Sequence, residues 1–145
     1  MEFKMTTINT DNFKVMPTGS MPVVRETTTP DTATLFNAVN GGSEPIKSVV
    51  DTGEPISVVN IVVTSTEINA ERDNPDSEIV SVPVAHFFTT TGEHYSTLSN
   101  GIMRGVKMIF ATGIVPTAEK PIELVFKSIN TKKGTAHSFD IVGGV

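Results

Sequence analysis

The stretch "HFFTTTGEHYSTLSNGIMRGVKMIFATG", residues 86–113, decides the fold because its apolar residues change from the spacing of a strand to that of a helix. The strand begins upstream, in "IVSVPVAHFF" (79–88), where a two-residue alternation places Phe87 on the face opposite Val80, Val82, Val84 and Phe88. Pro83 cannot donate to a strand ladder, so it marks an edge, a bulge or a bend. The helix is predicted from about 96 to 112, before Gly113, with its apolar face formed by Leu98, Ile102, Val106 and Ile109 or Phe110.

Further strands are predicted on both sides of this stretch. "TATLFNAV" (32–39) and the β-branched "PISVVNIVVTST" (55–66) precede it, and "IELVFKSIN" (122–130) and "TAHSFDIV" (135–142) follow it. Three phenylalanines of these strands are assigned to the core: Phe36, Phe126 and Phe139. Three strands, a helix and two strands is the order of an OB fold. The predicted fold class is therefore all-β, a five-stranded Greek-key barrel with one helix between strands 3 and 4 that closes its open end.

The length of 145 residues predicts a single domain. Residues 1–31, with three prolines and many Thr and Ser, are expected to form an irregular arm, and residues 32–145 the barrel. The chain has no cysteine, no run of eighteen apolar residues and no signal-peptide pattern, so a cytoplasmic protein without a membrane partner is expected.

Charge is distributed unevenly along a chain whose net charge is −5. Residues 1–89 carry five Lys and Arg against twelve Asp and Glu, whereas residues 90–145 carry six against four. An acidic protein can still recognise a polyanion through a local basic patch. Five cations are candidates for such a patch: Lys127, Lys132 and Lys133 around the last turn, Lys47 between the first two strands, and Arg72 within the acidic loop 67–78. The plainer alternative for a lysine-bearing turn is a solvated surface that discourages edge-to-edge pairing.

Three segments carry a resemblance to a known family. They are "LFNAVNGG" (35–42), "HFFTTTGEHYSTLSNGI" (86–102) and "LVFKSINTKKGTAHSFDIV" (124–142). Their order and approximate spacing resemble the small single-stranded DNA-binding proteins of protein-primed Bacillus podophages. The shared pattern is Phe-Asn-Ala with glycines, a Gly turn, Tyr-Ser-x-x-Ser before the helix, and a Lys-Gly hairpin. The resemblance implies a protein that coats single strands exposed during phage DNA replication in the host cytoplasm, with replication proteins as further candidate partners.

This activity needs cations along the phosphates and flat side chains on which bases stack. Tyr95, the only tyrosine, matches the family's Tyr-Ser motif, although the relatives have more tyrosines around the second and third strands. Phe87 is a second platform, and His94 is placed to stack or to contact a phosphate. The structural alternatives are a Tyr95 that closes the corner between strand and helix, a Phe87 covered on both barrel faces, and an exposed turn for His94. The complete set of predicted DNA-binding residues is Tyr95, Lys127, Lys132, Lys133, Phe87, Arg72, Lys47 and His94.

Other classes of function have less support in the sequence. The chain has no P-loop, no G-x-S-x-G and no H-E-x-x-H, and its three histidines are scattered, so we expect no enzyme, no metal and no cofactor. The alternative to DNA binding is a structural or oligomerising β-barrel module, such as a virion component, which the acidic charge and the few aromatic residues favour. Oligosaccharide binding on the same barrel face gains nothing specific from the sequence.

Overall fold

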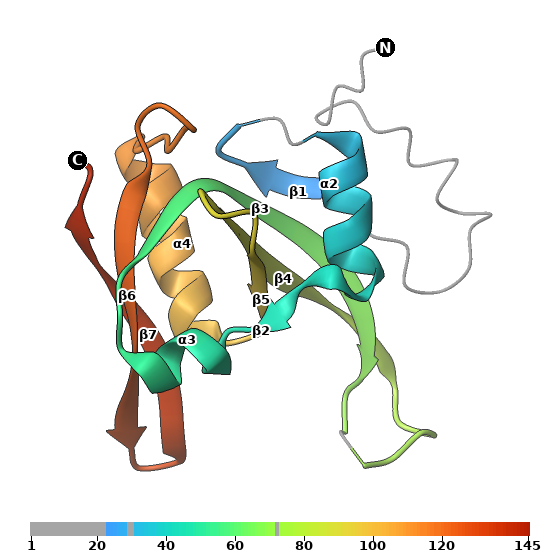
Figure 1. Cartoon of the computed structure of the whole chain (residues 1–145). Coiled ribbons are helices and arrows are strands. Elements are labelled where there is room, and N and C mark those ends of the chain that lie inside the picture. The colour runs from blue at the N-terminus through green and yellow to red at the C-terminus, as the bar shows by residue number, and fades with distance from the viewer. Residues whose placement is uncertain (1–22, 29–30, 72) are drawn as a thin grey trace.

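A curled half-barrel sheet makes up most of the protein, whose computed structural model describes residues 23–28, 31–71 and 73–145 (Figure 1). Among these residues the sheet has seven strands in the order β2-β5-β4-β3-β6-β7, with β1 added to β3. Their bounds are β1 Val23–Glu26, β2 Glu44–Pro45, β3 Ile56–Asn69, β4 Ile79–Thr89, β5 His94–Thr97, β6 Ile122–Thr131 and β7 Gly134–Gly143. All pairings are antiparallel except that of β2 with β5.

The long strand β3 joins the two halves of the sheet. It pairs with β4 from Val58 to Asn69 and with β6 only from Ile56 to Val58. The β3–β4 hairpin and the β6–β7 hairpin therefore diverge from this shared end, and both extend beyond the body of the molecule in Figure 1. The predicted strands at 55–66, 79–88, 122–130 and 135–142 are confirmed as β3, β4, β6 and β7. Pro83 lies on an edge, because β5 pairs with β4 only from Ala85 to Phe88.

The strand predicted at 32–39 is wrong, because this segment is helical. It forms α2 (Thr32–Asn37) and the π-helical turn η2 (Ala38–Gly42). Asp31 caps α2 by accepting a hydrogen bond from the backbone N–H of Thr34, which favours a helix over a strand. Leu35 and Ala38, one helical turn apart, then pack on the sheet.

The sequence did not predict the short strands β2 and β5 or the helix α3 (Lys47–Thr52). Strand β5 directly precedes the helix α4 (Asn100–Thr112). Within the predicted irregular arm, β1 pairs with β3, while residues 1–22 and 29–30 lie outside the described residues. Among the described residues five strands precede α4 and two follow it, so the predicted order of three strands, a helix and two strands is found only when β1 and β2 are left out.

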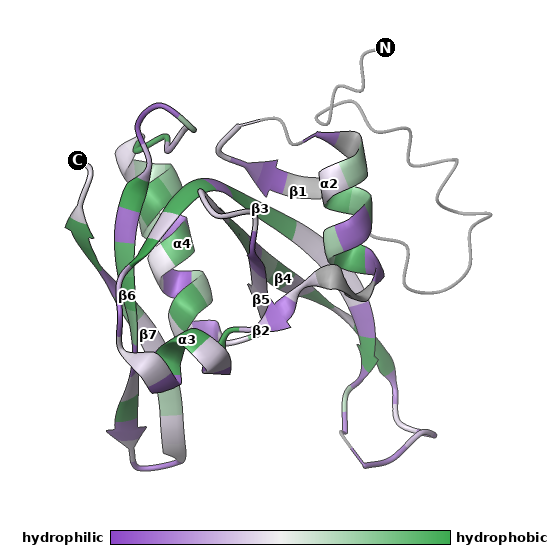
Figure 2. Cartoon of the chain, in the orientation of Figure 1, coloured by the Kyte–Doolittle hydropathy of each residue, from purple (hydrophilic) through white to green (hydrophobic). Residues whose placement is uncertain are grey.

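The main core lies between the inner face of the sheet and α4. Phe87, Phe126, Ile102 and Val106 are all at most 1% exposed, and the rings of Phe87 and Phe126 meet edge to face at 5.1 Å. The apolar face predicted for the helix is confirmed at Ile102, Val106 and Ile109, whereas Leu98 precedes α4 and is half exposed. Figure 2 shows the resulting alternation of hydrophobic and hydrophilic bands along α4.

A smaller core covers the outer face of the same sheet. Ala38 of η2 packs there with Val62 of β3 and Phe88 of β4, and Leu35 borders this cluster. Both faces of the sheet are therefore covered at its centre. Phe36, predicted to be a core residue, is instead 61% exposed on α2, because the helical spacing turns it away from Leu35 and Ala38.

Candidate nucleic-acid interface

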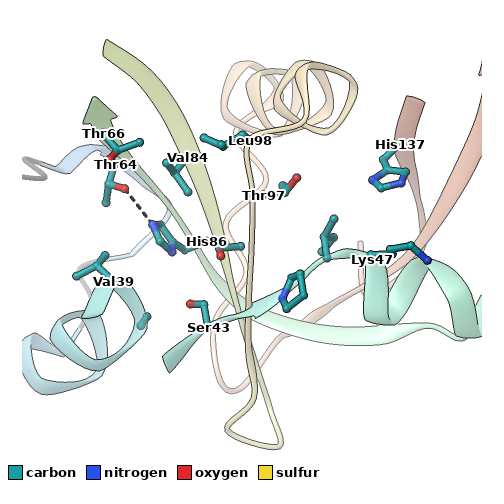
Figure 3. A pocket seen from close by; sticks show the side chains of 14 residues that line it. Val39, Ser43, Lys47, Thr64, Thr66, Val84, His86, Thr97, Leu98 and His137 are labelled. Carbon is teal, nitrogen blue, oxygen red and sulfur yellow. Dashed lines mark hydrogen bonds between the residues drawn. The ribbon is translucent and has the colours of Figure 1, made fainter. Parts of the chain in front are cut away.

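A cleft of about 580 Å³ lies between the outer face of the sheet, the segment 43–47 and the β6–β7 hairpin (Figure 3). Strands β3, β4 and β5 provide one wall, η2 and the start of α3 another, and His137 of β7 lies at the hairpin side. The lining residues are Ala38, Val39, Ser43, Pro45, Ile46, Lys47, Thr64, Thr66, Val84, His86, Ser96, Thr97, Leu98 and His137. Its volume is within the range of small-molecule sites in proteins.

His86 is the most deeply buried ionisable group of the cleft, with 4% of its surface exposed. Its Nε2 lies 2.9 Å from the hydroxyl oxygen of Thr64. Burial, and secondarily the nearby charge of His94, lower the pKa of His86 to about 4, so the ring is neutral at pH 7. An imidazole at this position can bind through hydrogen bonds but contributes no positive charge.

Two buried polar atoms of the cleft residues have no hydrogen-bond partner in the described part of the chain. They are Nδ1 of His86 and Oγ of Ser43. In Figure 3, Ser43, His86 and Thr64 gather on one side of the cleft, and Lys47 and His137 on the other. A buried unsatisfied donor or acceptor typically costs about 1–3 kcal/mol. A group that hydrogen-bonds these atoms would recover part of that cost.

Lys132 and Lys133 form the tip of the β6–β7 hairpin. Gly134 closes the turn at φ 121°, a conformation that other residues rarely adopt, and the hydroxyl of Thr131 donates to the Gly134 carbonyl at 2.6 Å. Both lysines are exposed, and neither makes an ion pair with any residue that the structure describes. They are therefore available to an anionic partner.

The other two predicted lysines already have acidic partners. The ammonium group of Lys127 lies 2.8 Å from the carboxylate of Asp140, and that of Lys47 lies 2.7 Å from the carboxylate of Asp51. Both pairs are exposed, and such pairs contribute little to stability. Lys47 still borders the cleft, whereas Lys127 lies on the outer side of the hairpin.

His137 is the residue of the β6–β7 hairpin that lines the cleft. The pairs Phe126–Phe139, Ser128–His137 and Asn130–Thr135 succeed one another on one face of the hairpin. This face is apolar at the core and becomes polar beyond Phe126 and Phe139. His137 was not predicted as a binding residue, because its only possible role considered from the sequence was that of a metal ligand. Its position two residues before the core residue Phe139 is the signal that would have placed it on the inner face.

The structure does not bring the predicted aromatic residues to this surface. Phe87 is fully buried, so the prediction that it is a base platform is wrong: its side of β4 faces the main core. Tyr95 is 6% exposed and pairs with Phe87 across the strands, and its hydroxyl donates to the carboxylate of Glu93 at 3.2 Å. Burial, followed by Glu93, raises the pKa of Tyr95. The alternative in which Tyr95 closes the corner before the helix describes its position better.

His94 and Arg72 are also separate from the cleft. His94 meets the ring of Phe88 edge to face at 4.8 Å and borders a second cavity of about 460 Å³, together with Asn60. The cluster of Ala38, Val62 and Phe88 lies between the two cavities, since Ala38 lines one and Phe88 the other. Arg72 lies outside the described residues, and the acidic side chains around it, Glu71 and Asp73, are exposed.

Across the described ranges, no three His, Cys, Asp or Glu residues are grouped so that they could hold a metal ion. None of the helices there has the length and apolar character that a membrane span requires.

Comparisons with protein-family models, with curated proteins and with solved structures find no match for the chain.

Proposed function

We propose that the protein binds single-stranded DNA without sequence preference and coats strands that are exposed during replication. One observation carries the proposal. The cleft on the outer face of β4 and β5 reaches His137 of a hairpin whose tip holds two lysines without an ion-pair partner among the described residues. Phosphate binding needs accessible cations, and strand binding needs a groove that leads to them.

The proposal includes an OB-like topology with a strand assignment that differs from the one predicted. If β3, β4, β5, β6 and β7 are taken as strands one to five, α4 lies between the third and fourth strands, as in an OB fold. OB folds bind oligonucleotides on strands two and three, between the loops that join strands one to two and four to five. These are β4 and β5, residues 70–78, and the Lys132–Lys133 turn. The cleft lies on this face, which supports the proposal.

The composition of the surface predicts binding dominated by phosphate contacts. Base stacking contributes about 1–3 kcal/mol per base, but His137 and the buried His86 are the only aromatic rings among the cleft residues. The affinity should therefore be modest per protein and fall steeply with salt. The exposed acidic side chains around residues 70–78 would repel a strand and direct it toward the lysine-bearing hairpin.

The biological role follows from the sequence resemblance. Under this proposal the chain acts in phage DNA replication in the host cytoplasm, protects exposed strands there, and works beside replication proteins. It is a binding protein that catalyses no reaction and needs no cofactor.

A structural or oligomerising module is the second candidate, and exposed apolar side chains favour it. Phe36 and Met108 are each 61% exposed, on α2 and α4 respectively. Large exposed apolar residues often mark contacts with other chains. Such a module would bind no nucleic acid at any salt concentration.

Fluorescence anisotropy of a labelled thirty-nucleotide oligo(dT) separates the two candidates. Titrations at low and moderate salt, with unlabelled duplex as competitor, should show binding that salt weakens and duplex does not displace. Absence of binding at low salt would reject the proposal and favour the structural module. Displacement by an equal concentration of duplex would instead indicate a general polyanion binder.

A further inference from the structure

We propose that the cleft takes up one unstacked base of the bound strand, with Nδ1 of His86 and Oγ of Ser43 hydrogen-bonding to the polar edge of that base. This inference rests on the proposed function and adds the contact that recognises the base. Its evidence is independent of the lysines, because it comes from the interior of the cleft.

The two polar atoms are the first evidence. Both belong to residues that line the cleft, and both lie just beneath its surface without a partner among the residues that the structure describes, so a base reaches them once neighbouring side chains shift. Native proteins leave few buried polar groups unsatisfied, and each exception points to an ordered water, an ion or a functional role. Here two exceptions fall at one cavity, on elements distant in the sequence: η2 is followed by Ser43, and His86 lies in β4.

The walls of the cleft suit the faces of a base. The lining of the cleft also includes apolar side chains: Val39, Ile46, Val84, Leu98 and the ring of Pro45. A base has two apolar faces and a polar edge, and single-strand recognition uses contacts to both. The volume of about 580 Å³ leaves space for the attached sugar as well.

The chemistry of the pair explains how one pocket would accept different bases. A neutral imidazole carries one donor and one acceptor, and either nitrogen can hold the proton. Because Thr64 can donate to Nε2 or accept from it, Nδ1 of His86 is free to be acceptor or donor. The hydroxyl of Ser43 can likewise do either. The polar edges of different bases can therefore be matched without a change of side chain.

The opposite side of the cleft suits the backbone of the same nucleotide. Lys47 and His137 lie there, away from Ser43 and His86 (Figure 3). Lys47 pairs with Asp51 at an exposed position, where such an interaction is weak, so a phosphate can compete for its ammonium group. A base inserted toward His86 would thus leave its phosphate near a cation.

The test compares two labelled thirty-nucleotide probes, oligo(dT) and an oligonucleotide of the same length whose sugars carry no bases. The variants are His86→Gln, which keeps a group at the Nε2 position but none at Nδ1, and Ser43→Ala. His86→Asn keeps a polar group near the Nδ1 position and serves as the rescue variant. Ser81→Ala is the matched control, because Ser81 is exposed in the same strand as His86. Circular dichroism establishes that each variant is folded.

The wild type should bind oligo(dT) more tightly than the abasic probe. Ser43→Ala and His86→Gln should weaken oligo(dT) binding about fivefold to tenfold, as expected for one lost hydrogen bond. They should leave the abasic probe unchanged, while His86→Asn should recover part of the loss and Ser81→Ala should match the wild type.

Three outcomes would overturn the inference. If the wild type binds both probes equally, no base enters the cleft. If it prefers oligo(dT) but folded Ser43→Ala and His86→Gln keep the full preference, the base is recognised elsewhere and the proposed function stands. If the wild type binds neither probe at low salt, the proposed function fails and the base pocket fails with it.

Discussion

His86 shows at the scale of one residue how burial connects stability with pH. Its pKa of about 4 in the folded protein lies below the usual 6.5, because the charged ring would lose its hydration. Between these two values the unfolded chain binds more protons than the folded one. The free energy of unfolding therefore falls as the pH falls from about 6.5 toward 4, and His86 has little effect above that range.

Denaturant unfolding at several pH values tests this effect of His86. If His86 binds a proton in the unfolded chain and not in the folded protein, the free energy of unfolding falls by at most about 3 kcal/mol. Since carboxylates and His94 also titrate, the useful quantity is the difference from His86→Gln, whose side chain does not titrate. We expect the wild type to lose more stability than this variant between pH 6.5 and 5. Parallel curves would contradict the burial of a neutral His86.

Tyr95 is a residue whose predicted role the structure replaces with a different one. Its ring belongs to the main core, and its hydroxyl donates only to Glu93 among the described residues. Tyr95→Phe keeps the ring, so we expect unchanged affinity for oligo(dT) and a stability loss of about 1 kcal/mol or less. Anisotropy and thermal unfolding measure the two effects. A large loss of affinity in a variant of unchanged stability would return Tyr95 to the binding surface.

At the scale of elements, periodicity predicts the long segments and not the short ones. β3, β4, α4, β6 and β7 were predictable because ten or more residues carry a consistent apolar spacing. The four residues of β5 are too few for a pattern. The segment 32–39 has the composition of a strand but forms a helix, because the cap at Asp31 and the packing of Leu35 and Ala38 on the sheet outweigh propensity.

The packing of α4 on β7 gives a prediction at this scale. A Cβ on Gly105 would lie 2.5 Å from the ring of Phe139, and one on Gly101 would meet the backbone carbonyl of His137. Ala normally stabilises a helix by about 1 kcal/mol relative to Gly. Here we expect both substitutions to destabilise the protein by about 1–3 kcal/mol, with Gly101→Ala more severe because backbone moves less easily than a ring.

Thermal unfolding of both variants checks this packing, with Arg104→Ala as the control at an exposed position of the same helix. A rise in the melting temperature for Gly101→Ala would show that α4 does not approach β7 this closely.

At the scale of the whole molecule, the sequence predicted the lysine-bearing hairpin but not the surface that it borders. The position of Lys132 and Lys133 at a hairpin tip was predictable because one tight turn, a local feature of the sequence, specifies it. Alternation correctly separated Phe87 from Val80, Val82, Val84 and Phe88, but Phe87 was wrongly interpreted as a base platform because alternation alone does not show which face is the core. Both faces are covered here, by α4 on one side and by η2 on the other. The cleft depends on residues from 38 to 137 and needs the assembled sheet.

The salt dependence of oligo(dT) binding tests the central claim most directly, with Lys132→Ala, Lys133→Ala as the double variant. Lys107→Ala, Lys120→Ala removes the same charge at two exposed positions elsewhere and serves as the control. For single strands the slope of log K against log salt changes by about 0.7 for each phosphate contact. The account predicts that the hairpin variant binds more weakly, with a slope shallower by up to about 1.4, and that the control keeps the wild-type slope. Equal slopes in all three proteins would contradict it, because the hairpin would then make no contact with phosphates.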